Sequence, residues 1–353
     1  MTDFYALLRT LCDLYAPSSL EDAVRQYLIE LLLPAADGMK TDRVGNLICY
    51  KKGKKSLDTP ILLSAHMDEV GFLVTDITAD GYLKFGTVGG VRPAILPSKR
   101  LYFPEEKLYG VISAKPIHLY RDEAELLTPT KLDGLWIDIG AKDREQAESA
   151  VSIGSIATFD RAYLPYLEAN GVIRSAALDD RLGCAMLAEL VLGNTPEYDL
   201  TVAFTVQEEC GCRGAAVLAS CETYASALAV EGTTASDLPD AEGADAVCFQ
   251  KKGGVLSLFD GATLYDRALV REAMAVLENA GIPVQTKRRL AGGNDASALQ
   301  RKAGAGKVLS FSAPVRYLHS PTSTAAKCDL DAMRAALPHL IGLIGKKQEE
   351  GTL

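Results

Sequence analysis

Apolar runs and amphipathic segments alternate along most of the chain, and their spacing predicts its elements. DTPILLSA at 58–65 is nearly all apolar, which is typical of a strand buried on both faces of a sheet. A further strand is expected in TDRVGNLICYKKG at 41–53. The segment at 18–33 is expected to be an amphipathic helix that starts at a capping signature, Ser18 followed three residues later by Glu21. Its apolar face comprises Val24, Leu28 and Leu31 or Leu32.

From about residue 71 to about residue 170 the sequence pattern changes and predicts short strands separated by turns rich in Gly, Pro and Asp. Asp80-Gly81 is a hairpin signal, and helical periodicity is nearly absent. After Ala176 strands and helices alternate again. The predicted order is a helix from Asp179, a strand at 201–207, a helix from Gly214, a strand at 227–230, a helix at 264–280, a strand at 282–286 and a last helix from Asp329.

This order predicts an α/β domain made of two chain segments, 1–70 and 171–353, interrupted by a small β domain at 71–170. A chain of 353 residues also exceeds what a single hydrophobic core usually supports. We therefore expect a discontinuous catalytic domain that carries an insertion.

Composition narrows the class of protein. Hydrophobic residues make up 48% and charged residues 24%, which is ordinary for a globular enzyme. A net charge of -9 disfavours nucleic acid and anionic membranes as partners. The amino-terminal residues do not resemble a signal peptide, and no apolar run approaches membrane-spanning length. The eight cysteines are then best interpreted as reduced thiols, and a cytoplasmic location is expected. Cys210 and Cys212 could be metal ligands, but packing under a turn is favoured because no second cysteine pair completes a zinc site.

Side chains that commonly bind metals stand at the ends of five apolar runs. In an open α/β sheet ligands gather outside the carboxyl ends of the strands, so these separate segments can converge on one site. One metal cluster would account for all of these side chains, so we expect the protein to be a hydrolase that uses two metal ions. The residues are His66 after PILLSA, Asp179 after SAAL, Glu208 and Glu209 after TVAFTVQ, Glu231 after SALAV, and His319 after PVRYL.

Each residue also has a structural interpretation. Asp68 lies on the same side of an extended segment as His66 and could orient its imidazole, although a structural pair at a strand end is about as common. Asp179 and Asp180 could simply cap a helix. Adjacent acids such as Glu208-Glu209 must point in different directions, so one can bind a metal while its neighbour acts as a general base.

The ordered set of motifs resembles the M42 family of metallo-aminopeptidases, the glutamyl-aminopeptidase and tetrahedral-aminopeptidase group. The resemblance covers essentially the whole chain. It rests on DRVGN, SAHMDEVGF, GYLKFGTVGG, ALDDRLGCAML, VQEECGCRGA, AVEGTTASDLP, GGNDASAL and RYLHSP. It implies a three-layer α/β/α catalytic domain like that of the zinc exopeptidases, with an inserted small β-barrel domain that is PDZ-like and serves dimerisation.

The resemblance also implies roles for the candidate residues. One metal would be held by His66, Asp179 and Glu231, and the other by Asp179, Glu209 and His319. Asp179 would bridge the two divalent ions, which we expect to be zinc, with cobalt or manganese as alternatives. Glu208 would act as the general base and Asp68 would orient His66. The implied activity is removal of the amino-terminal residue from short peptides by a water that two metals activate.

Two positions depart from the usual family residues: Glu231 stands where Asp is common, and Asn294 stands where Thr is common. No role is expected for Asn294 or for its neighbour Asp295. Members of the family form dimers through the barrel and often tetrahedral dodecamers, so a homo-oligomer is expected. A glycoside hydrolase is the alternative enzyme, because two carboxylates suffice for that chemistry, and a non-catalytic assembly scaffold is a third possibility.

Overall fold

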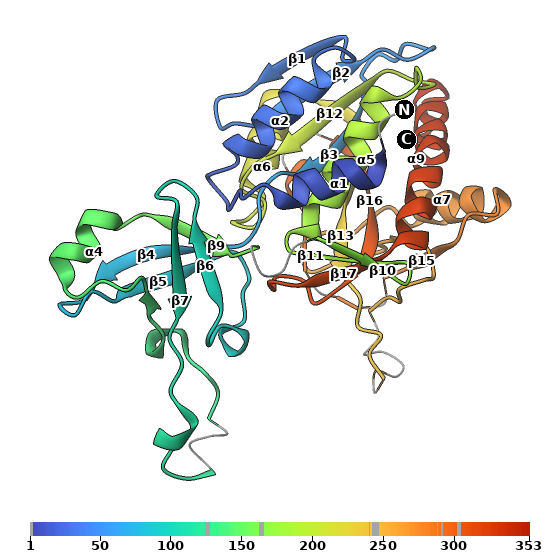
Figure 1. The fold of residues 1–353 in the computed structure, drawn as a ribbon. Helices are drawn as coiled ribbons and strands as arrows, with labels where there is room; N and C mark the ends of the chain where they lie inside the picture. The colour runs from blue at the N-terminus through green and yellow to red at the C-terminus, as the bar shows by residue number, and fades with distance from the viewer. Residues whose placement is uncertain are drawn as a thin grey trace.

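The chain folds into a layered α/β body and a smaller β-barrel that projects from it (Figure 1). The fold is given by a computed structural model that describes residues 3–123, 128–161, 166–239, 241, 247–287, 289–290, 292–301 and 305–353. The predicted fold class, an α/β body with an inserted small barrel, is confirmed. Within the described ranges, none of the helices combines the length and the apolarity that crossing a membrane requires.

A twisted sheet forms the middle layer of the larger body. Its four central strands, β12, β3, β13 and β16, run parallel, while the strands at both edges are antiparallel. All six residues of β3 are buried, as its unbroken apolar run predicts. In order across the sheet the strands are β1 (Gly38–Thr41), β2 (Leu47–Lys51), β12 (Leu200–Thr205), β3 (Ile61–His66), β13 (Tyr224–Thr234), β16 (Ala305–Arg316), β17 (Ser323–Ala326), β11 (Val172–Ser175) and β10 (Leu167–Ala169), and β14 (Gly254–Leu256) and β15 (Val284–Thr286) join beside β16.

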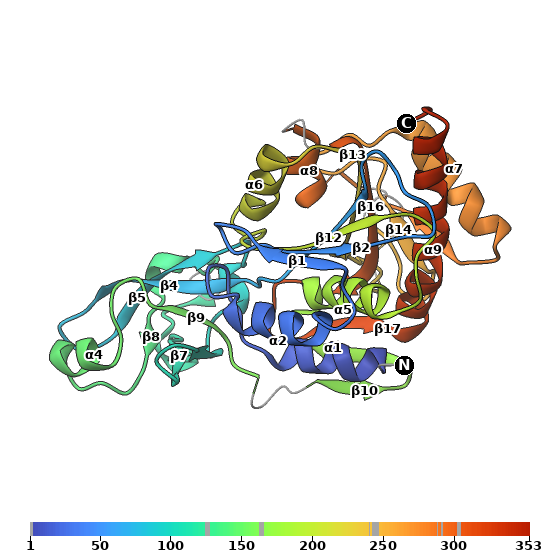
Figure 2. The same cartoon turned by 90° about the horizontal axis from the view of Figure 1, so that it is seen from above.

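Helices cover both faces of this sheet (Figure 2). On one face lie α1 (Phe4–Asp13), α2 (Asp22–Leu32) and α5 (Leu178–Leu192), and on the other lie α6 (Arg213–Cys221) and α8 (Asp295–Arg301). The long α9 (Lys327–Glu349) packs against β16 and β17, with α7 (Arg267–Asn279) beside it.

The start of α2 corrects one prediction. Its apolar face is as expected, since Val24, Leu28 and Leu32 are buried. The capping box is wrong, however: the hydroxyl of Ser18 donates to Asp68 (2.6 Å), α2 begins after Glu21, and no described side chain accepts from the amides of its first turn. Glu21 accepts from the backbone amides of Ser19 and Gln207. The turn before α2 is therefore tied to the loops that carry the candidate site.

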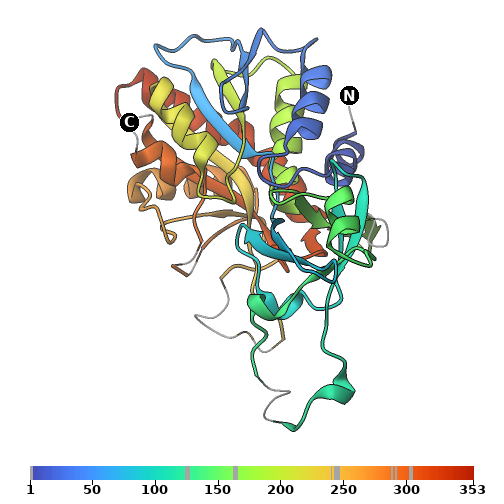
Figure 3. The ribbon, with the colours of Figure 1, turned by 90° about the vertical axis from the view of Figure 1, so that its left-hand side faces the viewer.

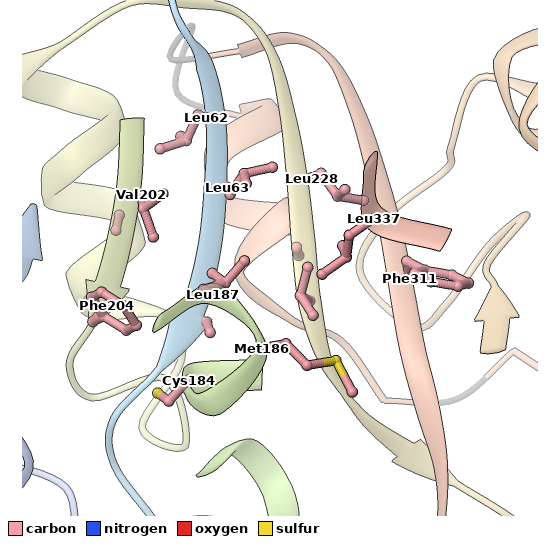
Figure 4. Close-up of a cluster of buried hydrophobic side chains, with 14 of the residues drawn as sticks. Leu62, Leu63, Cys184, Met186, Leu187, Val202, Phe204, Leu228, Phe311 and Leu337 are labelled. Carbon is pink, nitrogen blue, oxygen red and sulfur yellow. The ribbon is translucent and has the colours of Figure 1, made fainter. Parts of the chain in front are cut away.

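The core lies between α5 and the parallel strands (Figure 4). Leu63 of β3, Leu228 of β13 and Phe204 of β12 are fully buried, and Leu187 of α5 packs with them. Burial of each such side chain stabilises the fold by roughly 1.5–3 kcal/mol. This packing makes the sheet a rigid base for the loops at the carboxyl ends of its strands.

Six strands close the barrel in the order β4, β5, β8, β7, β6, β9. The hairpin predicted at Asp80-Gly81 is confirmed: Ile77 pairs with Leu83 across it, and Gly81 has φ +83°. A short helix, α4 (Arg144–Ala150), was not anticipated. The strands are β4 (Gly71–Ile77), β5 (Leu83–Val88), β6 (Arg100–Phe103), β7 (Leu108–Ile112), β8 (Ile137–Asp138) and β9 (Ile156–Phe159).

An arm extends from the barrel between β7 and β8, away from the layered body (Figure 3). Its described part contains single 3-10 turns at Ile117–Leu119 and Leu132–Gly134. Ile117 and Leu119 are 67% and 63% exposed, so the arm presents apolar surface to its surroundings.

Candidate active site

The structure brings the six predicted residues together at the carboxyl ends of the parallel strands. His66 is the last residue of β3, and Glu208-Glu209 follow the end of β12. Glu231 lies within β13, one residue past its apolar run, and His319 follows β16. Asp179 opens α5, directly after β11. The convergence expected from the sequence is thus a property of the fold.

Asp179 lies between the two histidines. Its Oδ1 is 3.5 Å from Nε2 of His66, and its Oδ2 is 3.8 Å from Nε2 of His319. Asp179, Glu209 and His319 each place one ligand atom within 4.8 Å of the others. One carboxylate therefore faces two separate imidazoles with different oxygens, which is the placement that a shared ligand requires.

The neighbouring Asp180 has the structural role that was considered for both acids. Its Oδ1 accepts from the amide of Gly183 at 2.9 Å, which caps α5, and its Oδ2 accepts from the amide of His66 at 3.0 Å. The backbone at Asp179 and Asp180 is non-helical, so the two side chains diverge. Asp180 holds β3 and α5 together while Asp179 faces the cavity.

Asp68 is fully buried beside His66. The Nδ1 of His66 is 3.4 Å from Asp68 Oδ1 and 3.2 Å from the Asp68 carbonyl oxygen. The same carboxylate accepts from Ser18 and from the amides of Glu208 (2.9 Å) and Glu209 (3.1 Å). Burial would raise the pKa of Asp68, but these hydrogen bonds and His66 lower it below its usual value. Asp68 thus links the loop after β3 to the loop after β12.

Glu208 and Glu209 point to different neighbours, as predicted. Glu209 Oε1 is 3.2 Å from Nε2 of His319, whereas Glu208 Oε2 is 4.0 Å from Nε2 of His66. Burial raises the pKa of Glu208 well above its ordinary value, and Glu209 and Asp295 act in the same direction. A raised pKa makes a carboxylate a stronger base, as a group that accepts a proton during catalysis needs to be.

Glu231 is held by a set of donors that sequence reasoning missed. Its Oε1 accepts from Asn294 (2.6 Å) and from the hydroxyls of Ser310 and Ser312 (3.3 Å each). Burial raises its pKa to about 8, with Asp179 adding to the effect. Asn294 lies in the motif GGNDASAL, so the signal was present, but no sequence pattern links residue 294 to residue 231.

Three further residues lie at the site: Gly90 and Asp295, for which no role was predicted, and Cys212, for which packing under a turn was favoured over metal binding. Gly90 of the barrel accepts a hydrogen bond from Nδ1 of His319 through its carbonyl oxygen (2.8 Å), so the insertion orients one of the histidines. Cys212 is buried at the start of α6, with its thiol 3.4 Å from Glu208. Asp295 accepts from Thr205 at 2.5 Å, and its other oxygen is buried with no hydrogen-bond partner among the residues that the structure describes.

The acids and histidines line one cavity of about 750 Å³. The lining of this cavity also includes glycines and basic side chains, among them Gly292, Lys287 and Arg301. A cavity of this size holds a small substrate or the end of a peptide.

Comparison with known proteins identifies the class. The chain belongs to the family described as M42 glutamyl aminopeptidase, whose pattern it matches over residues 45–335. A putative aminopeptidase of Acetivibrio thermocellus is 34% identical over 93% of this chain and 96% of its own length. The chain is therefore an aminopeptidase, a hydrolase of peptide bonds.

Solved structures share the whole architecture. A TET aminopeptidase from a marine sediment Thaumarchaeota archaeon is 29% identical, with a TM-score of 0.91 over 99% of both chains. The TET1 peptidase of Pyrococcus horikoshii, described as assembling into a tetrahedron or a large octahedral shell, is 31% identical with a TM-score of 0.83, over 96% of this chain and 99% of its own.

Proposed function

We propose that the protein is a two-metal aminopeptidase that removes the amino-terminal residue of short peptides. His66, Asp179 and Glu231 would hold one divalent ion, and Asp179, Glu209 and His319 the other. The observation that carries this proposal is the position of Asp179, whose two oxygens face His66 and His319 separately. A ligand set of imidazoles and carboxylates suits zinc, cobalt or manganese.

The charge of the site fits such ions. Asp179, Glu208, Glu209 and Glu231 line one cavity, and burial raises the pKa of the last three. Carboxylates crowded in this way repel one another unless cations lie between them. When bound, the two ions would lower the pKa of a water molecule and polarise the scissile carbonyl.

The chain's own residues would then handle the proton and the substrate. Glu208, beside the proposed ligands but directed toward His66 and Cys212, would accept the proton of the attacking water and pass it to the leaving amine. Asp68 would keep the imidazole of His66 in place through its contacts with Nδ1. Glu231, which lines the cavity, would help to receive the free α-amine.

The test begins with metal content. Protein loaded with zinc, cobalt or manganese is expected to bind two ions per chain, and stripping with EDTA should abolish hydrolysis of aminoacyl p-nitroanilides until metal is restored. Glu208→Gln should keep both ions and lose at least about 100-fold in kcat. Glu278→Gln, an exposed change, is the matched control. Full turnover by Glu208→Gln would reject the base assignment.

Peptide ends provide a second test. A blocked amino terminus would leave the acids that receive the amine without a partner, so acetylated peptides should be cleaved far more slowly than free ones. Equal rates would exclude an exopeptidase. The glycoside hydrolase alternative is weaker, because Glu208 and Glu209 lie on one loop and the two histidines would have no function.

We also propose a homo-oligomer in which the inserted domain, assigned to residues 71–170 between catalytic segments 1–70 and 171–353, forms the contacts. Its exposed apolar side chains support this: Tyr109 and Val111 on β7 are 47% and 44% exposed, beside Ile117 and Leu119 on the arm.

A further inference from the structure

Glu208, Cys212 and Asp295 form a second group of metal-binding side chains beside the candidate site. One ligand atom of each lies within 4.8 Å of the others, and the group is separate from the one that contains Asp179. The sulfur of Cys212 is 3.4 Å from Oε1 of Glu208 and 3.9 Å from the hydroxyl oxygen of Ser297. Cys212 and Asp295 are both buried. The sequence left metal binding by Cys212 open, and the structure places two acids beside its thiol.

One oxygen of the Asp295 carboxylate lacks a donor. Its Oδ2 accepts from the hydroxyl of Thr205 at 2.5 Å, whereas its Oδ1 is buried and has no hydrogen-bond partner among the described residues. Asp295 is only 4% exposed, so solvent does not compensate for the missing donor. Burying a polar atom without a partner is unfavourable, and burying a carboxylate without one is more unfavourable still. A cation bound beside Cys212 and Glu208 would provide that oxygen with a partner.

The ligand types in this group select the kind of cation. A thiolate with two carboxylates suits zinc, and cobalt as its substitute, whereas magnesium, calcium and manganese prefer oxygen ligands. Cys212 is the N-cap of α6, and the positive end of a helix favours a thiolate. Glu208, Cys212 and Ser297 also line the substrate cavity, so an ion in that cavity can reach the group.

We propose that Glu208, Cys212 and Asp295 bind a third divalent ion, zinc or cobalt, and that this ion inhibits the enzyme. On binding, the sulfur of Cys212 bonds to the metal and the thiol proton passes to solvent. Glu208, once it is a ligand, can no longer accept the proton of the attacking water. The inhibition rests on the proposed function, whereas the binding does not.

The third ion is expected to bind after the other two. Burial raises the pKa of the Cys212 thiol, so the metal must displace a tightly held proton. The two proposed catalytic sites use imidazoles and carboxylates and involve no thiol. An excess of metal over two ions per chain should therefore be needed to fill the third site.

Cobalt tests the binding independently of catalysis. The two proposed catalytic sites offer only nitrogen and oxygen ligands, so a sulfur-to-cobalt charge-transfer band in the near ultraviolet reports the third ion alone. Titration of metal-free protein with Co²⁺ should fill two sites without this band and a third site with it. Titration with Mn²⁺ should stop at two ions per chain. Cobalt-saturated protein without the band would overturn the proposal.

Variants assign the band to its ligands. Cys212→Ser should still bind two Co²⁺ ions, which shows that it is folded, but should lose the band. Asp295→Asn keeps the shape of the side chain and should weaken binding of the third ion about 10-fold or more. Cys210→Ser is the matched control, because it removes the other, partly exposed thiol of the same CGC motif and should keep the band. A band that persists in Cys212→Ser would overturn the assignment.

Activity tests the inhibition. Wild-type enzyme that holds two Zn²⁺ ions should lose hydrolysis of leucyl p-nitroanilide as the Zn²⁺ concentration is raised further. Cys212→Ser, compared with its own starting rate, should need about 10-fold more Zn²⁺ for the same loss. Equal sensitivity to Zn²⁺ in the two proteins would overturn the inhibitory role of this group.

The outcomes separate the third site from the proposed function. Two bound ions with full turnover and no sulfur band would overturn the third site and leave the proposed function standing. A sulfur band in protein that hydrolyses no aminoacyl substrate at any metal loading would support the third site and overturn the proposed function.

Discussion

At the scale of single residues, the two positions where the resemblance led us to expect other residues are in contact. Asn294, where Thr was expected, donates at 2.6 Å to Oε1 of Glu231, where the shorter Asp was expected. Ser310 and Ser312 donate to the same oxygen, which leaves Oε2 without a hydrogen bond among the described residues. The longer side chain of Glu231 is thus fixed by a partner matched to it, and one oxygen stays available for a metal.

We expect Glu231 and Asn294 to be energetically coupled. Asn294→Thr should weaken metal binding about 10-fold or more, because it removes the amide that orients a ligand. Glu231→Asp alone should also weaken it, since the shorter acid no longer meets Asn294. The pair Glu231→Asp with Asn294→Thr should recover part of the loss, with a coupling energy of about 1 kcal/mol. Metal titrations of all four proteins would measure it, and strict additivity would contradict the coupling.

At the scale of elements, strand ends were predictable and the contacts between loops were not. The unbroken apolar runs before His66 and Glu208 predict strands that are buried on both faces of a sheet. Such strands are usually parallel, so their carboxyl ends lie at the same edge. The turn that aims His319 depends on positive φ at Tyr317 and His319 and on the carbonyl of Gly90, more than 200 residues away in the chain. Neither local pattern nor periodicity encodes a partner at that distance.

Helix α1 and the start of α2 also show that local sequence pattern did not predict every element or hydrogen bond. The first helix, Phe4–Asp13, has Leu7, Leu8 and Leu11 buried, and no element was predicted for this segment. Ser18 has the local signature of a helix cap, yet its hydroxyl donates a hydrogen bond to the buried carboxylate of Asp68. Tertiary hydrogen bonds to charged groups outweigh a neutral cap.

A buried ion cluster joins the elements of the two bodies. Glu69, after β3, pairs with Arg161 beyond the last barrel strand and with Arg181 of α5 (3.3 Å), and it also accepts from the amide of Ala16 (2.9 Å). Burial acts to raise the pKa of Glu69, but the two arginines lower it below its usual value. One carboxylate therefore connects the amino-terminal loop, the barrel and the catalytic layer.

Replacing Glu69 by Gln should destabilise the protein by about 3 kcal/mol at neutral pH, because two guanidinium groups lose their counter-charge. A lowered pKa in the folded state means that the charge stabilises the fold above the unfolded value, about 4.3, and that this contribution is lost as the pH falls through the folded value. The gap in unfolding midpoint between wild type and Glu69→Gln should shrink in acid. Thermal melts from pH 7 downward would show this, with Glu145→Gln, an exposed change, as the control. A gap that widens in acid would contradict the assigned charge state.

At the scale of the whole molecule, the barrel both completes the site and presents a surface for association. The carbonyl oxygen of Gly90, in the insertion, accepts a hydrogen bond from His319, so the position of the insertion affects the orientation of a proposed metal ligand. The barrel also exposes Tyr109 and Val111, and the arm exposes Ile117 and Leu119. Exposed apolar side chains that gather in a patch often mark an interface.

We therefore expect the protein to be at least a dimer in solution and the arm to be part of its contacts. The double change Ile117→Asp and Leu119→Asp places two charges in the proposed interface, where burial without partners is strongly unfavourable, and should shift the mass toward the monomer. Light scattering after size-exclusion chromatography measures the molar mass in solution. The control is Leu264→Asp, at a leucine of the α/β body that is 75% exposed. If the doubly charged arm assembles like the wild type, the contacts lie elsewhere, and a wild-type monomer would remove the oligomer proposal altogether. Because Nδ1 of His319 donates to Gly90 of the insertion, loss of assembly accompanied by weaker metal binding would further indicate that contacts between subunits hold His319 in place.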